Sequence, residues 1–187
     1  MTRAQAEQLI NSPDPSTLKG RRDRVILALL AGCGLRRAEA ANLTMKDIQQ
    51  RDGRWVLVDL HGKHGRIRTV PVPAWVKQAI DLWTEEAGLV EGRILRSVNH
   101  RGEVGHSLSP QAVFAVVAEC GGRLQLRIKP HDLRRTCAKL CRAGGGELEQ
   151  IQMLLGHASI QTTERYLGVK QDLAHAPNDR IGIGWYG

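Results

Sequence analysis

The one β-type stretch that the sequence shows clearly reads Trp55-Val56-Leu57-Val58-Asp59-Leu60-His61-Gly62-Lys63-His64-Gly65-Arg66-Ile67-Arg68-Thr69-Val70-Pro71-Val72. Residues 55–60 and 67–72 are rich in β-branched and apolar side chains, which favour strands. The segment between them contains two glycines, as expected of a turn that joins antiparallel strands. The sequence therefore predicts one β-hairpin, with basic side chains in its turn.

Helical patterns surround this hairpin on both sides. Thr2-x-x-Gln5 fits a capping box and predicts a helix over 3–11, which Pro13 ends. Apolar residues recur at helical spacing from about residue 20 until Gly32 and Gly34 break the pattern. Further helices are expected over 37–43, 73–87, 109–120, 130–143, 147–155 and 159–167, with a loop containing at most one short strand over 92–108. The fold class is mainly α with a small antiparallel β-sheet.

The charge of the chain is positive and unevenly placed. The 187 residues contain 27 Lys and Arg against 19 Asp and Glu, a formal net charge of +8. The surplus falls in residues 61–75 and 93–142, which an acidic segment separates. Because clustered positive charge commonly binds a polyanion, the first expectation is a nucleic-acid partner.

The remaining composition predicts a single cytoplasmic domain. No apolar run approaches the roughly 18 residues of a membrane span, and the start of the chain does not resemble a signal peptide. The four cysteines show no metal-ligand spacing, so we expect free, mostly buried thiols in a reducing compartment and no metal site. They are Cys33, Cys120, Cys137 and Cys141.

Three motifs contain side chains suited to phosphate chemistry. His131 and Arg134 are three residues apart at a helix start, and therefore share a face. A Leu-Gly-His element ends in His157, and Tyr166 follows nine residues later. Far upstream, a glycine-mediated turn is followed by Arg36. Each motif alone is equally consistent with a solvated face or a salt bridge.

Together these motifs resemble the tyrosine recombinases, or phage-integrase family, which includes bacterial chromosome-dimer resolvases and integron integrases. The resemblance covers about residues 1–180, and the order and spacing of the motifs agree. The matching residues are Gly34-Leu35-Arg36 with Glu39, Gly62-Lys63 with Val70-Pro71, His131 with Arg134, Leu155-Gly156-His157, and Tyr166.

The resemblance implies a tyrosine recombinase catalytic-domain fold, the core of DNA breaking and rejoining enzymes, over residues 1–180. Residues 181–187 are expected to form a C-terminal tail. Family members usually carry an N-terminal helical DNA-clamping domain, and we expect it to be absent because the motifs begin by residue 34. Cys33 departs from the family, in which many members have threonine there, and aromatic residues are expected in place of Leu95 and Cys137.

The resemblance makes Tyr166 the nucleophile that cleaves DNA through a 3′-phosphotyrosine. An unperturbed phenol titrates near pH ~10, so about one part in a thousand is ionised at neutral pH. Positive groups around the phosphate offset this deficit because they favour the phenolate and the transition state. We assign Arg36 and Arg134 to this clamp, since a planar guanidinium meets two phosphate oxygens at once.

Three further side chains complete the expected chemistry. His157 is a further donor to the phosphate, and His131 takes or relays the tyrosine proton. Lys63, in the hairpin turn, protonates the departing 5′ oxygen as general acid. No cofactor or metal is expected, because side chains supply the charge and the phosphotyrosine retains the bond energy for rejoining.

Other residues are candidates for DNA contact, for structural support or for contact between protomers. Arg135, Lys139 and His64 either contact DNA phosphates or face solvent. Glu39 is expected to be a structural partner that orients Arg36 or a neighbour. The apolar tail residues, Ile181, Ile183, Trp185 and Tyr186, either dock on a neighbouring protomer or form a frayed end.

The predicted function is site-specific DNA recombination or integration. The alternatives are relaxation of supercoils in the manner of a type IB topoisomerase, and DNA binding by a non-catalytic relative. The expected partners are double-stranded DNA and further protomers in a tetrameric synapse, with no membrane.

Overall fold

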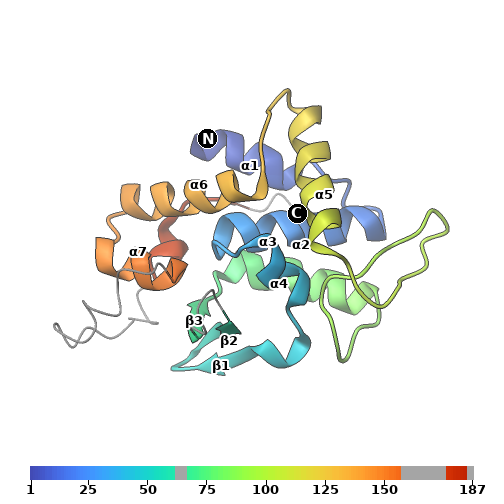
Figure 1. The fold of residues 1–187 in the computed structure, drawn as a ribbon, viewed down its shortest axis with the longest axis horizontal. Helices are drawn as coiled ribbons and strands as arrows, with labels where there is room; N and C mark the ends of the chain where they lie inside the picture. Colours follow the sequence, from blue (N-terminus) through green and yellow to red (C-terminus); the bar gives the residue numbers. More distant parts are fainter. Residues whose placement is uncertain (62–66, 157–175, 185–187) are drawn as a thin grey trace.

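A computed structural model describes residues 1–61, 67–156 and 176–184 (Figure 1). The fold is mainly α with a small antiparallel sheet, which confirms the predicted class. The longer helices are α1 (Arg3–Asn11), α2 (Leu18–Gly32), α3 (Arg37–Asn42), α4 (Ala74–Glu86), α5 (Pro110–Arg123), α6 (Pro130–Ala143) and α7 (Leu148–Leu155). The strands are β1 (Ile48–Arg51), β2 (Arg54–His61) and β3 (Ile67–Pro71), and two short 3-10 helices are η1 (Met45–Asp47) and η3 (Pro177–Arg180).

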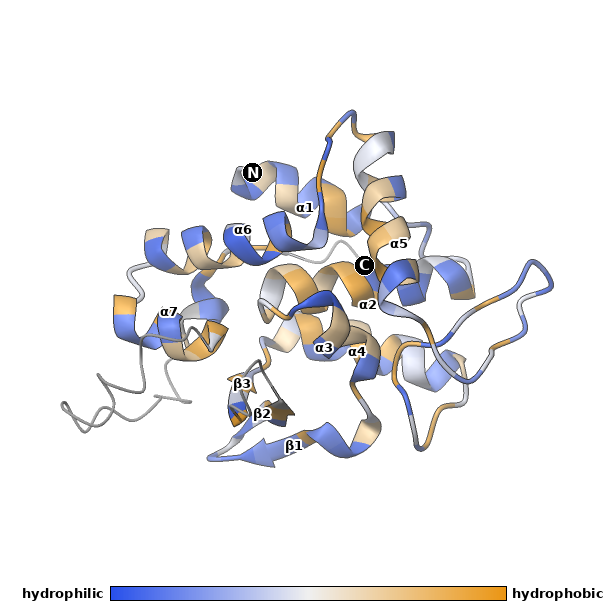
Figure 2. Ribbon diagram, in the orientation of Figure 1, coloured by the Kyte–Doolittle hydropathy of each residue, from blue (hydrophilic) through white to orange (hydrophobic). Residues whose placement is uncertain are grey.

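Helix α2 is the centre of the molecule, in contact with α1, α3, α4, α5 and α6. Residues 25–31, in the second half of α2, have no exposed surface, and Figure 2 shows part of this helix in orange. A helical segment that is apolar on every side is stable only where other elements cover it completely. The helix starts at Leu18 rather than near residue 20, because the Thr17 side chain caps it by accepting a hydrogen bond from the Gly20 N–H.

Side-chain caps are present at two other helix starts. Thr2 and Gln5 form the expected capping box at α1. The Ser109 hydroxyl accepts a hydrogen bond from the backbone of the first turn of α5. Helix α5 continues beyond Cys120 through Gly121 and Gly122 to Arg123. The following chain returns close to Gly121, where a Cβ would lie 2.6 Å from Ile128 Cγ1.

The sheet has three strands in the order β1-β2-β3, one more than predicted. Strand β1 joins β2 through a two-residue turn, Asp52-Gly53, in which both residues have positive φ. Such a turn suits the right-handed twist of a hairpin. Strands β2 and β3 form the predicted hairpin, with a shift in register between Leu57 and Leu60.

The C-terminal part of the described chain packs on the chain's own core. Ile181 and Ile183 are buried, and the fully buried Asn178 donates to the Pro71 carbonyl at 2.7 Å. This differs from both expectations for these tail residues, since apolar contacts and one hydrogen bond anchor the segment within the chain. Trp185 and Tyr186, and the helix expected over 159–167, lie outside the described residues.

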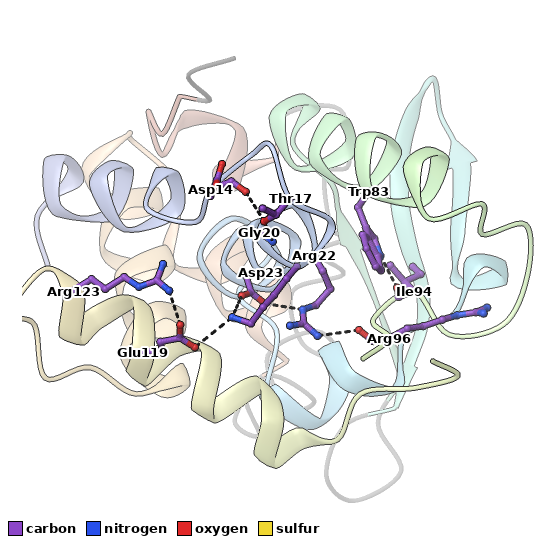
Figure 3. Close-up of polar contacts among 11 residues, drawn as sticks. Asp14, Thr17, Gly20, Arg22, Asp23, Trp83, Ile94, Arg96, Glu119 and Arg123 are labelled. Carbon is purple, nitrogen blue, oxygen red and sulfur yellow. Dashed lines mark hydrogen bonds and ion pairs between the residues drawn. The ribbon is translucent and has the colours of Figure 1, made fainter. Parts of the chain in front are cut away.

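The cysteines are buried as the sequence predicts, and one tryptophan joins the core. All four cysteines are buried and free, and burial raises the pKa of the Cys33 thiol. Trp83 is fully buried, and its indole N–H donates to the Ile94 carbonyl at 2.8 Å (Figure 3). Within the part of the chain that the structure describes, no helix is both long and apolar enough to cross a membrane.

Candidate active site

The structure places Arg36 at the entrance of α3, directly after a tight turn. Gly34 has φ of +61°, and a Cβ on it would lie 2.7 Å from Leu155 Cδ2. Only glycine combines this left-handed conformation with so close a contact. The turn directs Arg36 towards the start of α6 while its own backbone N–H donates to Glu39 at 2.8 Å. The Arg36 side chain keeps 32% of its surface exposed.

Arg134 is the most deeply buried of the predicted site residues that the structure describes. It lies on α6, is 3% exposed, and donates through Nη1 to the Gly34 carbonyl and through Nη2 to the Leu155 carbonyl. These bonds tie α6 to the turn before α3 and to the end of α7. Burial lowers the pKa of Arg134 to about 10, aided by the positive charges of Arg36 and Arg68, so the group stays protonated at neutral pH.

One cleft contains three of the predicted catalytic residues. Arg36, Arg134 and His131 line a cavity of about 290 Å³ at the start of α6. His131 is exposed and lies one turn before Arg134, as the His-x-x-Arg spacing predicts. The other lining residues are Leu35, Arg37, Phe114, Lys129 and Pro130. The cleft therefore combines basic groups with apolar walls.

Glu39 is the carboxylate that connects the basic groups. Its Oε1 accepts from Arg36 Nη1 at 2.7 Å and from Arg68 Nη1 at 2.8 Å, and its Oε2 accepts from Arg68 Nη2 at 2.8 Å. Burial opposes ionisation, but the hydrogen bonds and charges of Arg68 and Arg36 lower the pKa of Glu39 to about 2. The predicted contact between Glu39 and Arg36 is present. Below, Arg36, Glu39, Arg68 and Arg134 are called the Glu39 cluster.

Arg68 is the member of this cluster that the sequence analysis missed. It lies on β3, and its Nε donates to the Leu154 carbonyl at 3.1 Å besides its two bonds to Glu39. The signal available in the sequence was the alternation of the strand, which places Arg68 on the same face as the buried Val70. A charged side chain on a buried strand face is rarely found without a charged partner, so this position indicated an ion pair.

Two of the predicted DNA-binding residues lie on the outside of α6. Arg135 and Lys139 are exposed and four residues apart, so they lie on one helix face. Within the described residues, neither forms an ion pair. Their ammonium and guanidinium groups are available to an anion approaching that surface.

Four predicted site residues lie outside the described residues: Lys63, His64, His157 and Tyr166. The described elements end next to two of them in the sequence. Strand β2 ends at His61, two residues before Lys63, and α7 is followed by Gly156, one residue before His157. Gly156 is in the left-handed conformation that commonly ends a helix.

The described geometry suits an anion. The Glu39 cluster holds three guanidinium groups against one carboxylate, and two of these guanidinium groups line the cleft. Arg134 uses two of its five N–H groups on backbone carbonyls, which fixes its plane and leaves the rest for a ligand. Among residues 1–61, 67–156 and 176–184, no group of three His, Cys, Asp or Glu side chains is placed to hold a metal ion.

Comparison with known proteins agrees with this fold and with the predicted family. The phage integrase family matches residues 1–172. The tyrosine recombinase XerA of Thermococcus onnurineus (strain NA1) is 31% identical over 169 residues, which are 90% of this chain and 57% of the relative. The tyrosine recombinase XerC of Myxococcus xanthus is 34% identical over 172 residues, 86% of this chain and 55% of the relative.

A solved structure gives the same architecture. The XerH site-specific recombinase, crystallised with difH substrate as a pre-cleavage complex, superposes with a TM-score of 0.68 over 91% of this chain and 51% of its own, at 24% identity. The fold is thus that of a recombinase catalytic domain. The chain belongs to the phage integrase family of tyrosine recombinases. It spans a little over half the length of the curated relatives named above.

Proposed function

We propose that this chain is the catalytic domain of a site-specific DNA recombinase or integrase, which cleaves and rejoins double-stranded DNA through a 3′-phosphotyrosine on Tyr166. The observation that carries the proposal is the cleft in which Arg36 and Arg134 converge beside His131. Family membership supports the same reaction, and the substrate-bound XerH structure supports DNA as the substrate.

In the proposed cleavage step, the Tyr166 oxygen attacks the scissile phosphorus and the bond to the 5′ oxygen breaks. The phenolic proton passes to His131, and Lys63 gives a proton to the departing 5′ oxygen. Arg36 and Arg134, with His157, stabilise the negative charge that develops on the non-bridging oxygens. Rejoining is the reverse reaction, with a 5′-hydroxyl as the nucleophile.

The Glu39 cluster favours this step because its guanidinium groups are fixed before the substrate arrives. Arg134 is held by two carbonyls and Arg36 by a carboxylate, so neither loses much conformational freedom on binding phosphate. Exchange between two duplexes requires four strand cleavages. One tyrosine per protomer therefore makes a tetrameric synapse the simplest assembly on DNA.

The test is covalent attachment to a nicked suicide substrate, in which the cleaved strand diffuses away and the adduct accumulates. We expect a protein–DNA adduct on denaturing gels. Tyr166→Phe should abolish the adduct and leave DNA affinity nearly unchanged, because it removes one hydroxyl and no charge.

Tyr186→Phe is the control, and it should form the adduct as the unaltered chain does. An adduct that persists in Tyr166→Phe would exclude Tyr166 as the nucleophile. DNA binding without any adduct would favour a non-catalytic binder, and relaxation of supercoiled plasmid without strand exchange would favour a topoisomerase.

A further inference from the structure

Arg68 occupies a position at which a charged side chain is unusual. It lies on β3 opposite Leu60, just beyond the irregularity in register, and its side chain is 8% exposed. Val70, two residues on and so on the same face, is fully buried. An arginine on the inner face of a strand persists only where its charge and its donors are satisfied.

The Arg68 guanidinium is satisfied by two different elements. Both of its Nη atoms donate to the Glu39 carboxylate on α3, at 2.8 Å each. Its Nε donates to the Leu154 carbonyl, in the last turn of α7, at 3.1 Å. The stem of the side chain runs past Gly156, where a Cβ would lie 2.7 Å from Arg68 Cδ. One side chain thus joins β3, α3 and α7.

These are the elements that hold the phosphate clamp. The Glu39 oxygen that accepts from Arg68 Nη1 also accepts from Arg36 Nη1. The carbonyl next to that of Leu154 belongs to Leu155 and accepts from Arg134. Arg36 therefore shares a carboxylate oxygen with Arg68, and Arg134 bonds to the carbonyl that follows the one bonded by Arg68. Arg68 itself is nearly buried, and three of its five N–H groups donate hydrogen bonds within the protein. It therefore does not reach a substrate.

We propose that Arg68 is a positioning residue of the active site, which holds Glu39 and the end of α7 at a fixed separation and thereby sets the distance between Arg36 and Arg134. The inference rests on the proposed function. Without Arg68, Arg36 is the one remaining cation on Glu39 among the described residues, and both carboxylate oxygens turn to it. Arg36 is then drawn away from the cleft and its charge is neutralised.

Lysine cannot replace Arg68 fully. A guanidinium is planar and reaches a carboxylate with two parallel bonds while a third donor points elsewhere. An ammonium group at the end of a flexible chain retains the charge but not this geometry. The variant Arg68→Lys therefore keeps Glu39 neutralised while it loosens the connection between α3 and α7, and Arg68→Met removes both effects.

The experiment compares Arg68→Met and Arg68→Lys with the matched variants Arg22→Met and Arg22→Lys. Arg22 is also buried and ion-paired, but it lies on α2, outside the Glu39 cluster (Figure 3). Three quantities are measured for each 187-residue variant: the melting temperature, the Kd for a nicked suicide substrate by fluorescence anisotropy, and the single-turnover rate of adduct formation at saturating protein.

We expect Arg68→Met to lower the saturated rate about 100-fold, the scale of a misplacement of about 1 Å in an active site, with Kd nearly unchanged. Arg68→Lys should fall between Arg68→Met and the unaltered chain. Both Arg22 variants should keep the unaltered rate below their melting temperatures. Should Arg68→Met not fold, a reduced rate for folded Arg68→Lys still supports the proposal.

Two results overturn the proposal. One is an unaltered saturated rate in the folded Arg68 variants, even if Kd increases. The other is an equal loss of rate in Arg22 and Arg68 variants of matched melting temperature, which would mean that burial alone matters. The absence of any adduct with the unaltered chain would instead contradict the proposed function, so the two failures are distinguishable.

Discussion

Among the described residues, two clusters join several basic side chains through a shared buried carboxylate, and they differ in charge balance. In the first, called here the Asp23 cluster, Asp23 binds Arg22 at 2.6 Å and Lys19 at 3.2 Å. Lys19 also reaches Glu119, which binds Arg123 in turn (Figure 3). Positive and negative groups alternate along this cluster, so nearly every charge has its counterpart.

The Glu39 cluster uses the same residue types with a different result. One carboxylate serves Arg36 and Arg68, while Arg134 is paired only with carbonyls among the described residues. The positive surplus faces a cleft instead of a neutralising partner. The two clusters therefore differ mainly in whether their charges balance within the protein.

The largest expected difference between the clusters is in the chemical step. Arg134→Ala should lower the saturated rate of adduct formation about 100- to 1000-fold, because it removes a fixed donor to the transition state. Arg22→Ala, in the Asp23 cluster, should keep the rate of the unaltered chain. Single-turnover gels measure the rates of both variants. Similar rates would contradict the prediction that only the Glu39 cluster takes part in the chemical step.

The next effect is on stability in acid. The pKa of Glu39 is lowered from 4.5 to about 2 in the folded chain. Its contribution to the free energy of unfolding is complete above about pH 4.5, where the carboxylate is ionised in both states. As the pH falls towards 2, the unfolded chain takes up the proton first, so about 3 kcal/mol of stability is lost.

Urea unfolding between pH 2 and pH 7 checks this expectation. Glu39→Gln should flatten the dependence of the unfolding free energy on pH in the acidic range. The matched control is Glu119→Gln, which changes a carboxylate that is about half exposed in the Asp23 cluster. An equally steep acidic loss in Glu39→Gln and the unaltered chain would show that another group dominates.

The smallest expected effect is on DNA affinity. Arg135→Ala and Lys139→Ala should each weaken binding on every sequence and reduce the slope of log Kd against log salt by about 1, as loss of one phosphate contact does. Arg123→Ala, in which the lost arginine already pairs with Glu119, should leave the slope as it is. Anisotropy titrations at several salt concentrations separate these cases.

The elements with local signals could be predicted from the sequence. Thr2 with Gln5, and Ser109 with Pro110, mark helix starts because a cap depends on residues three apart or closer. Strand β1 was missed because its sequence, Ile-Gln-Gln-Arg, shows no apolar alternation and is mostly exposed. Its signal was the Asp52-Gly53 pair, which favours a two-residue hairpin turn.

The site was predictable as far as it follows spacing within one helix. His131 and Arg134 face one cleft because they are three residues apart on α6. The role of Arg68 was not predictable, because its partner Glu39 is 29 residues away and its register depends on the irregularity in β2. Burial of Ile181 and Ile183 likewise depends on the shape of the core, which no local pattern specifies.

The anchoring of residues 176–184 has a consequence for the order in which the protein folds. Asn178 bonds to Pro71 across 107 residues, and Arg134 bonds to Gly34 across 100. Contacts of such sequence separation close large loops, so they form after local helices and hairpins. During synthesis, the strand that contains Arg68 and Pro71 emerges 107 residues before its partner Asn178. The Gly34 turn likewise emerges 100 residues before Arg134, so the proposed DNA-cutting activity arises only after these distant segments have met.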